Sequence, residues 1–226
     1  MKQFSILLLF AGTLTSSVFC QEKKSTEAFE KIVIADGVFA QIVSSSDYSL
    51  EIKANNQSQN CLVTTVENGI LTLKKRSKST CTEDIFVSII CPYIKSIEVI
   101  GKSELTSKGI LRTDSLNINV RNRSKVYIDV EVAYLKAELS EGSILNARGN
   151  TEFIKANLVT SAILSTYDLK ANDAKIRCTS GAMAKVCVNN TLEAQTIGNS
   201  YIGYKCSPEK KIFDTSSGGK IEQVSP

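Results

Sequence analysis

The chain has 226 residues, 42% of them hydrophobic and 22% charged, and it contains neither histidine nor tryptophan. This balance is typical of globular proteins and argues against wholesale disorder. The lack of histidine excludes Ser-His-Asp hydrolases, Cys-His proteases and zinc sites built on imidazole. The net charge of +4 is small, and the densest basic cluster, Lys74–Lys78, has no interleaved aromatic residue. We therefore expect no nucleic-acid partner and interpret this cluster as a solvated hairpin end.

Residues 1–20 are predicted to be a secretory signal peptide. Lys2 precedes a short apolar run, Phe4–Phe10, which is too short to span a bilayer. Cleavage after Cys20 leaves Gln21 as the first residue. The alternative is a lipoprotein acylated on Cys20, but Phe19 argues against it because the lipoprotein enzyme prefers a small residue at that position. We expect an exported protein of the periplasm, outer-membrane surface or extracellular space, without a transmembrane segment.

Six cysteines remain after residue 20, and an even number in an exported chain indicates disulfides. Cys187 and Cys206 lie at nearly the same point of consecutive repeats, which are described below, so they are predicted to form one bridge. Cys61 and Cys81 flank a hairpin and its basic extension and are predicted to form another. Cys91 and Cys178 occupy apolar strand positions and are interpreted as small core residues.

The first part of the mature chain reads as a tether followed by short strands. Residues 21–28 are polar and unpatterned, whereas from residue 29 to residue 92 apolar residues recur with a period of two. Asp36-Gly37 is a turn signal between two strands, and Asn68-Gly69 closes the clearest hairpin. We expect residues 29–92 to form a β-hairpin region that caps the remainder of the fold.

From residue 93 to residue 226 the pattern repeats every 19 residues or so. The same small residue of a turn recurs at intervals of 18 to 21 residues, at Ser103, Ser124, Ser143, Ala162, Ala182, Ser200 and Gly219. In each copy an alternating strand meets a small polar turn and then a second alternating strand. No segment has an apolar stripe at helical spacing.

One such copy cannot bury its apolar residues alone, but stacked copies form a continuous core. The sequence therefore predicts an all-β fold, a parallel β-solenoid of the single-stranded right-handed β-helix type, although the sequence does not determine its handedness. Small residues such as Ala137, Ala156 and Ala194 suit so narrow a coil. Residues 29–226 are expected to form one continuous domain, in which the C-terminal segment is a degenerate rung that caps the stack against edge pairing.

The order of these motifs resembles a family of secreted Bacteroidetes proteins described as putative auto-transporter adhesins, head GIN domain. The resemblance covers residues 29–224, and the Ser-Gly-x-Ser turn of the family is complete in no rung; Arg121–Ser124 and Val159–Ala162 depart from it most. The resemblance implies a β-solenoid with a strand-rich start and transfers no functional residues. It rests on Phe29, Ile32, Ile34, Gly37 and Phe39, on Thr65, Val66, Asn68, Gly69, Leu71 and Leu73, and on Pro92, Ile94, Ile97, Val99, Gly101 and Ser103.

No convergent cluster of reactive side chains stands out in the repeats. The acidic residues alternate with core residues and are expected to face solvent, where lysines and arginines such as Lys136, Lys155 and Lys175 form cross-rung ion pairs with them. Asp168 and Asp173 lie near an extra residue that suggests a bulge. Calcium loops are absent from the sequence. The tyrosines of the repeats could bind sugars or pack at corners: Tyr127, Tyr134, Tyr167, Tyr201 and Tyr204.

We therefore expect an exported, non-catalytic β-solenoid without catalytic, metal or cofactor-binding residues. It would serve as an adhesin or scaffold whose partner is a cell-surface glycan or an envelope protein. Two alternatives remain open: a carbohydrate-active β-helix enzyme, either a polysaccharide lyase or a hydrolase, and a lipoprotein subunit of an envelope complex.

Overall fold

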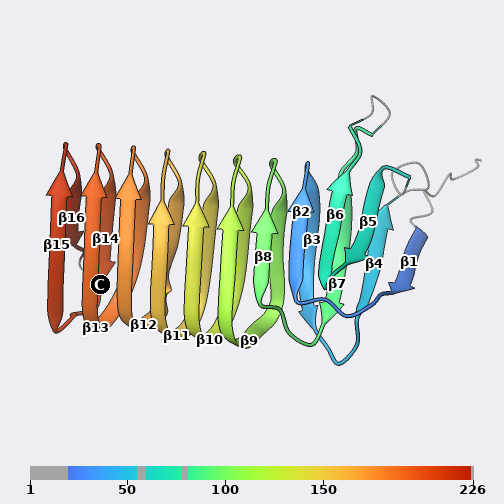
Figure 1. The fold of residues 1–226 in the computed structure, drawn as a ribbon, viewed down its shortest axis with the longest axis horizontal. Helices are drawn as coiled ribbons and strands as arrows, with labels where there is room; N and C mark the ends of the chain where they lie inside the picture. Colours follow the sequence, from blue (N-terminus) through green and yellow to red (C-terminus); the bar gives the residue numbers. More distant parts are fainter. Residues whose placement is uncertain (1–19, 55–59, 78–80, 225–226) are drawn as a thin grey trace, which may run out of the picture.

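A computed structural model describes residues 20–54, 60–77 and 81–224, and every regular element in these ranges is a β-strand. The signal peptide predicted for residues 1–20 lies, except for Cys20, outside the described residues. Figure 1 shows the strands standing side by side in one long stack. The strands are β1 (Cys20–Ser25), β2 (Lys31–Ala35), β3 (Val38–Ser44), β4 (Ser49–Ala54), β5 (Leu62–Glu67), β6 (Ile70–Lys75), β7 (Ile85–Cys91), β8 (Ser96–Val99), β9 (Glu104–Val120), β10 (Lys125–Leu139), β11 (Ile144–Leu158), β12 (Ile163–Thr179), β13 (Met183–Ile197), β14 (Tyr201–Lys205), β15 (Lys210–Ser216) and β16 (Lys220–Gln223).

The repeats form the predicted parallel β-solenoid. Each rung runs up one layer, reverses at a tight turn and runs down a second layer, and the long strands β9–β13 bend at a corner between the two layers. We call the strand segments before each turn layer A and those after it layer B. In layer A the final segment of β10 pairs with β9 and β11, and in layer B its first segment does the same, always in parallel.

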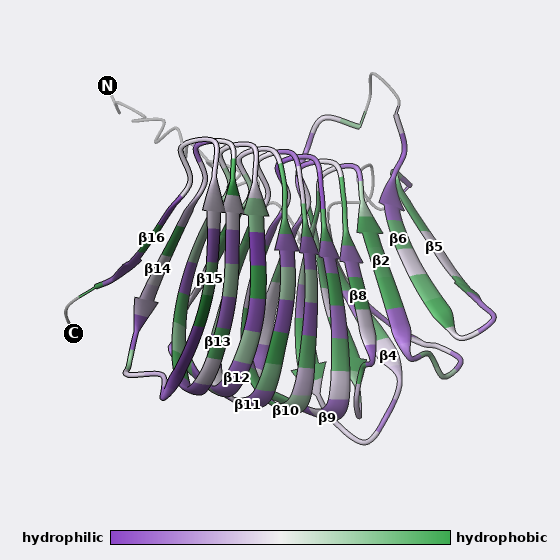
Figure 2. Cartoon of the chain, turned by 60° about the vertical axis from the view of Figure 1, so that its left-hand side comes forward, coloured by the Kyte–Doolittle hydropathy of each residue, from purple (hydrophilic) through white to green (hydrophobic). Residues whose placement is uncertain are grey.

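The core is a narrow channel between the two layers. Inward-facing residues alternate with exposed ones along each strand, which produces the stripes of hydropathy in Figure 2. One layer A column runs through Ile118, Ala137, Ala156, Ile176 and Ala194, each 3% exposed or less. Alanine and isoleucine share this column because two layers joined by a tight turn leave little room between them.

Every rung turn has two consecutive residues with positive φ, the geometry of a type I′ turn. The two turns that depart most from the family pattern keep this geometry, at Asn122-Arg123 and at Thr160-Ser161. Left-handed conformations favour glycine and asparagine, so these turns adopt them at some energetic cost. Stacking against neighbouring rungs therefore determines the turn more strongly than its own residues do.

The first strands correct one part of the hairpin prediction. β2 and β3, joined by Asp36-Gly37, do not pair with each other but form a rung: β2 pairs in parallel with β6 and β8, and β3 with β7 and β9. This rung lies between the β6/β7 rung, which is later in the sequence, and the first repeat. The Asn68-Gly69 hairpin of β5 and β6 is present as predicted.

Antiparallel strands complete the N-terminal end of the stack. β5 pairs with β6 in layer A, and β4 pairs with β7 in layer B. The expected tether is also corrected, because Cys20–Ser25 forms β1, which pairs with β4 along its whole length. At the opposite end, β15 and β16 form the last rung of the described residues, in which β15 pairs with β13 and β16 with β14.

The buried serine of the turn stabilises the stack in some rungs. The single hydrogen of the Ser200 hydroxyl is shared between the carbonyl oxygens of Cys178 and Ile197, at 2.8 and 2.9 Å, and the hydroxyl oxygen accepts from the Ile197 amide at 3.0 Å. The equivalent Ser124 is fully buried, and its hydroxyl has no partner among the described residues. The same position is alanine in two other rungs, Ala162 and Ala182, so alanine fits there.

We predict that Ser200→Ala lowers the free energy of unfolding by about 1–3 kcal/mol, because it removes a buried hydroxyl that donates to the Cys178 and Ile197 carbonyls and accepts from the Ile197 amide. The matched variant Ser124→Ala should change it by less than about 0.5 kcal/mol or raise it, since that hydroxyl is buried without a hydrogen bond. Urea denaturation of both variants measures the difference. Equal losses would show that the Ser200 hydrogen bonds contribute nothing.

Candidate functional site

Large exposed hydrophobic side chains occur at two main places. Phe86, Ile110 and Tyr127 lie on the outer surface of layer B and are 50%, 37% and 37% exposed. Ile212 and Phe213 lie in the last rung. Single exposed apolar residues are ordinary on a protein surface. Phe86 and Tyr127, however, each line one of two adjoining hollows of layer B.

Layer B is also where the register of the solenoid is least regular. The pairing of β10 with β9 shifts between Tyr127 and Asp129, and that of β11 with β12 shifts between Asn146 and Gly149. Gly149 has φ +118°, and a Cβ there would lie 2.1 Å from the carbonyl oxygen of Val130. Such bulges are frequent beside functional sites, where they turn a side chain in a new direction.

The irregular strands line a polar groove of about 330 Å³. In it Arg148 makes a paired contact with Asp129, from Nε to Oδ1 at 2.8 Å and from Nη2 to Oδ2 at 3.2 Å. Hydrogen bonding and charge from Asp129 raise the pKa of Arg148, and the charge of Asp168 adds to this. The groove is lined by Thr106, Ser107, Tyr127, Ile128, Asp129, Asn146, Arg148 and Asp168.

A second hollow of about 280 Å³ adjoins this groove, and Thr106 lines both. Phe39 and Phe86 stack beside each other in it, with ring centroids 5.2 Å apart and planes inclined by 30°. Gln41 donates a hydrogen bond to Thr106 at 3.4 Å. The two hollows adjoin at Thr106. The second hollow contains the stacked rings together with Lys53 and Glu104, and the polar groove contains Tyr127 and the Arg148–Asp129 pair.

The structure separates the two acids that the sequence placed near a bulge. Asp168 lines the polar groove, whereas Asp173 lies at the corner, where its Oδ1 accepts a hydrogen bond from the Thr191 amide at 2.9 Å. The predicted bulge is present, since β12 shifts against β13 between Thr166 and Lys170. Asp173 therefore has a structural role, and only Asp168 belongs to the groove.

The tyrosines of the repeats differ in their surroundings, and several of them pack against neighbouring residues. Tyr134 stacks on Phe153 of the next rung, with centroids 5.5 Å apart, and Tyr204 is 6% exposed. The hydroxyls of Tyr167 and Tyr201 lie in the space that the Cβ of any larger residue at position 203 would need. Gly203, which has no side chain, therefore lets the two hydroxyls approach its backbone. Tyr127 is the predicted tyrosine that lines the groove.

Cross-rung ion pairs form at only some of the expected positions. Lys136 contacts Glu138 of its own strand at 3.5 Å, and Lys155 has no ion pair among the described residues. Arg112 contacts Glu131 of the next rung at 2.8 Å, and Lys175 contacts Glu193 at 2.5 Å. Arg112 and Glu131 line a shallow trough of about 740 Å³ that follows the corner of the solenoid. The side chains of this trough are mostly charged residues and amides.

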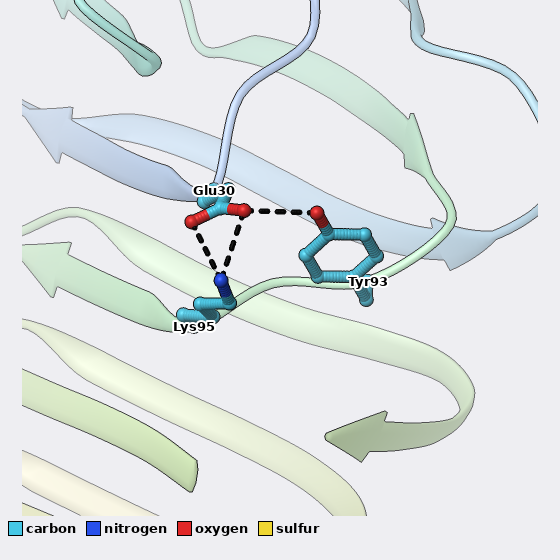
Figure 3. Close-up of polar contacts among 3 residues, drawn as sticks. All are labelled: Glu30, Tyr93 and Lys95. Carbon is cyan, nitrogen blue, oxygen red and sulfur yellow. Dashed lines mark hydrogen bonds and ion pairs between the residues drawn. The ribbon is translucent and has the colours of Figure 1, made fainter. Parts of the chain in front are cut away.

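Three polar residues join the first rung to the start of the repeats. Figure 3 shows Glu30 accepting hydrogen bonds from Lys95 and from Tyr93, all at 2.9 Å. The hydrogen bond from Lys95 is the main cause of the lowered pKa of Glu30, and the hydrogen bond to Glu30 raises the pKa of Tyr93. The backbone carbonyl of Glu30 also accepts from the amides of Lys95 and Ser96. This cluster positions the chain where it enters β8.

Three carboxyl groups have a lowered pKa because basic or hydroxyl side chains lie beside them. Burial alone would raise the pKa of Glu98, but Lys31 and Arg121 lower it overall, and hydrogen bonds from Lys220 and Tyr201 lower that of Glu222. The pKa of Glu30 is lowered in the same way by Lys95 and Tyr93. The described ranges contain no group of side chains suited to hold a metal ion.

Two disulfides join the cysteines in the combinations that the sequence suggested. Cys61 is bonded to Cys81 and Cys187 to Cys206, with Cα atoms 5.6 and 5.3 Å apart. Cys91 and Cys178 are buried thiols, and burial raises their pKa values to about 11 and about 12. Such thiols are poor nucleophiles because the thiolate is the reactive form.

The family described as "Putative auto-transporter adhesin, head GIN domain" matches residues 28–208 of the chain. The match spans the irregular first rungs, both hollows of layer B and nearly all the repeats. The chain belongs to this family. No curated protein matches the sequence. In residues 20–54, 60–77 and 81–224 of this GIN-domain protein, no helix is long and apolar enough to cross a membrane.

Solved structures share the GIN-domain fold over almost their whole length. A putative adhesin from Bacteroides fragilis has a TM-score of 0.84 and 18% identity, with 92% of this chain and 98% of that chain covered. A putative adhesin from Parabacteroides merdae has a TM-score of 0.66 and 17% identity, covering 92% and 96%. A putative lipid binding protein from Parabacteroides distasonis has a TM-score of 0.66 and 18% identity, covering 91% and 97%.

Sequence reasoning missed Arg148, Asn146 and Phe86 as residues of the GIN-domain surface. Gly149 was a usable signal, because an isolated glycine within a strand often marks a bulge or a close backbone approach. Phe86 was another, since it alternates with the inward-facing Ile85 and Val87 and therefore points to solvent. The proximity of Arg148 and Asn146 to Tyr127 and Asp168 depends on rung order and could not be deduced from spacing alone.

Proposed function

We propose that the protein is an exported, non-catalytic binding module of the cell envelope that holds a glycan on layer B. Membership in the GIN family and the two disulfides support an oxidising location outside the cytoplasm. The observation that carries the proposal is the continuity of two hollows through Thr106, one with stacked aromatic rings and one with a carboxylate–guanidinium pair.

The chemistry of this surface suits sugar rings. The C–H faces of a sugar pack against aromatic rings such as Phe39 and Phe86, while its hydroxyls need donors and acceptors of fixed geometry. Arg148, Asp129 and Asn146 supply both, and the pairing of Arg148 with Asp129 holds their planar groups in place. Parallel strands are about 4.8 Å apart, so a linear glycan crossing several rungs would contact both hollows.

A glycan array probed with the folded protein tests this proposal, together with variants Phe86→Ala and Arg148→Ala. Binding to a subset of glycans should weaken by roughly 10-fold or more in each variant, as loss of a buried contact of about 1.4 kcal/mol implies. The matched control is Arg112→Ala, because Arg112 also pairs with a carboxylate across rungs but lines the corner trough. Weakening by Arg112→Ala alone would place the ligand at the trough and contradict the proposal.

The enzyme alternative is tested in parallel by a lyase and hydrolase screen on the glycans that bind. We expect no turnover. Cleavage that is lost in Asp129→Asn or Asp168→Asn, with binding retained, would instead establish a carbohydrate-active enzyme. Mass spectrometry of the mature N-terminus tests the lipoprotein alternative, because an acylated Cys20 and a terminal Gln21 differ greatly in mass.

A further inference from the structure

The last rung of the solenoid leaves its layer A strand exposed. All residues of β15 are exposed, including Ile212 at 47% and Phe213 at 40%. Phe213 continues the core column of Ala194 in the previous rung, where the same position is 1% exposed. β15 therefore presents to solvent one apolar residue at a core position, Phe213, and one on the outer face, Ile212, which lies beside the outward-facing Glu193 of the previous rung.

The outer edge of β15 is also unpaired in the described part of the chain. β15 pairs with β13 alone, and β16 continues layer B beside β14 rather than covering β15. At the other end of the stack, antiparallel β5 and β4 pair with the β6/β7 rung. An exposed strand edge is a template for pairing with another chain.

We propose that this edge pairs with β15 of a second copy of the chain, antiparallel and centred on Ile212. In this register Ile212 of each copy faces Ile212 of the other. Lys210 lies opposite Asp214 of the second copy, and the twofold axis repeats this pair on the other side. Shifting the centre to Phe213 instead places Ile212 opposite Asp214 and leaves Lys210 without an acidic partner.

The inward-facing residues of β15 also match across this axis. Lys211 lies opposite Phe213 of the second copy, and an ammonium group beside an aromatic ring is a favourable contact. Lys211 already lies over the ring of Tyr204, 5.5 Å from its centroid. Each copy contributes the same strand edge, that of β15, to the contact. The contact therefore closes as a dimer and does not propagate into a fibre.

A single pair of strands is a small interface, so the dimer is expected to be weak and dependent on concentration. It would nevertheless place two copies of the layer B surface in one assembly. Two linked binding surfaces can raise the avidity for a repetitive ligand by 100-fold or more without new contacts. Dimerisation does not depend on which ligand layer B binds.

Analytical ultracentrifugation of the secreted chain from about 1 µM to 1 mM tests the proposal, with variants Lys210→Glu, Asp214→Lys and the double variant. Each single charge reversal creates two repulsive pairs across the axis, so the dissociation constant of the dimer should rise about 10-fold. The double variant restores opposite charges and should dimerise within about 3-fold of the original chain. Lys185→Glu, on layer B, controls for a general effect of surface charge and should leave the dissociation constant unchanged.

A chain that stays monomeric up to 1 mM would overturn the proposal. So would single variants that dimerise like the original, or a double variant that is as weak as the single ones. Circular dichroism should show the same thermal transition for Lys210→Glu and the original chain, since Lys210 is exposed and does not contact the core. Glycan binding by these variants at low concentration reports on layer B separately from dimerisation.

Discussion

Gly149→Ala should lower the free energy of unfolding by about 3 kcal/mol or more. The new Cβ would lie 2.1 Å from the carbonyl oxygen of Val130, far inside van der Waals contact, and φ at this position is +118°. The steric overlap with the Val130 carbonyl and the left-handed backbone conformation each cost about 1–3 kcal/mol. Neither strand can move away easily, because Val130 and Gly149 are themselves partners in the parallel ladder of β10 and β11. Urea denaturation of the folded protein measures the loss.

The matched control is Gly142→Ala. Gly142 also has positive φ, at +67°, but its nearest neighbour to an added Cβ is the flexible side chain of Arg123 at 3.7 Å. This variant should cost only about 1–2 kcal/mol, the price of a left-handed conformation for an L-residue. Equal losses in the two variants would show that the close approach to Val130 relaxes. Gly149→Ala should also disturb Arg148, so it should weaken glycan binding where Gly142→Ala does not.

Replacing Cys187 and Cys206 together by serine should lower the free energy of unfolding by about 3 kcal/mol. The bridge closes a loop between residues that are 19 apart in sequence, and the entropy of an unfolded chain without that constraint accounts for a loss of this size. The bridge also joins β13 to the residue after β14, so its loss should loosen the last rungs first. Thermal unfolding under non-reducing conditions measures the change.

The Cys61–Cys81 pair provides the comparison at the other end of the molecule. Its sequence separation is 20 residues, so the double serine variant should lose a similar amount of stability. A variant with all four cysteines replaced should be insensitive to dithiothreitol, whereas the original chain should lose stability when the reagent is added. An original chain whose transition is unaffected by complete reduction would contradict both predictions.

The solenoid was predictable because its signal is repeated. Turn residues such as Ser124, Ser143 and Ser200 recur at nearly constant spacing, and stacking turns a weak local pattern into a strong one. The same spacing placed Cys187 beside Cys206. The position of β2 and β3 was not predictable, because Asp36-Gly37 forms the same tight turn whether the flanking strands pair with each other or enter separate layers.

The candidate site was harder to predict than the fold. Asp168 was singled out by an irregular rung, but its neighbours come from other rungs, and Phe39 and Phe86 come from strands separated by more than forty residues. Which outward-facing residues adjoin one another depends on register, and bulges at Asn146 and Thr166 change that register locally. A repeat pattern predicts that a surface exists but not which side chains meet on it.

The inverted order of the first rungs has a consequence for how the chain folds. From the rung formed by the end of β9 and the start of β10 onward, each rung contacts the rung made just before it, so this part of the structure can grow one rung at a time as the chain emerges. The β2/β3 rung is different, because its two neighbours, β6/β7 and β8/β9, are both made after it. The N-terminal strands must therefore wait for more than sixty residues of later sequence before they are enclosed, and loop closure makes such contacts slow to form. The N-terminal half should fold and unfold as one cooperative unit, while rungs at the C-terminal end fray singly.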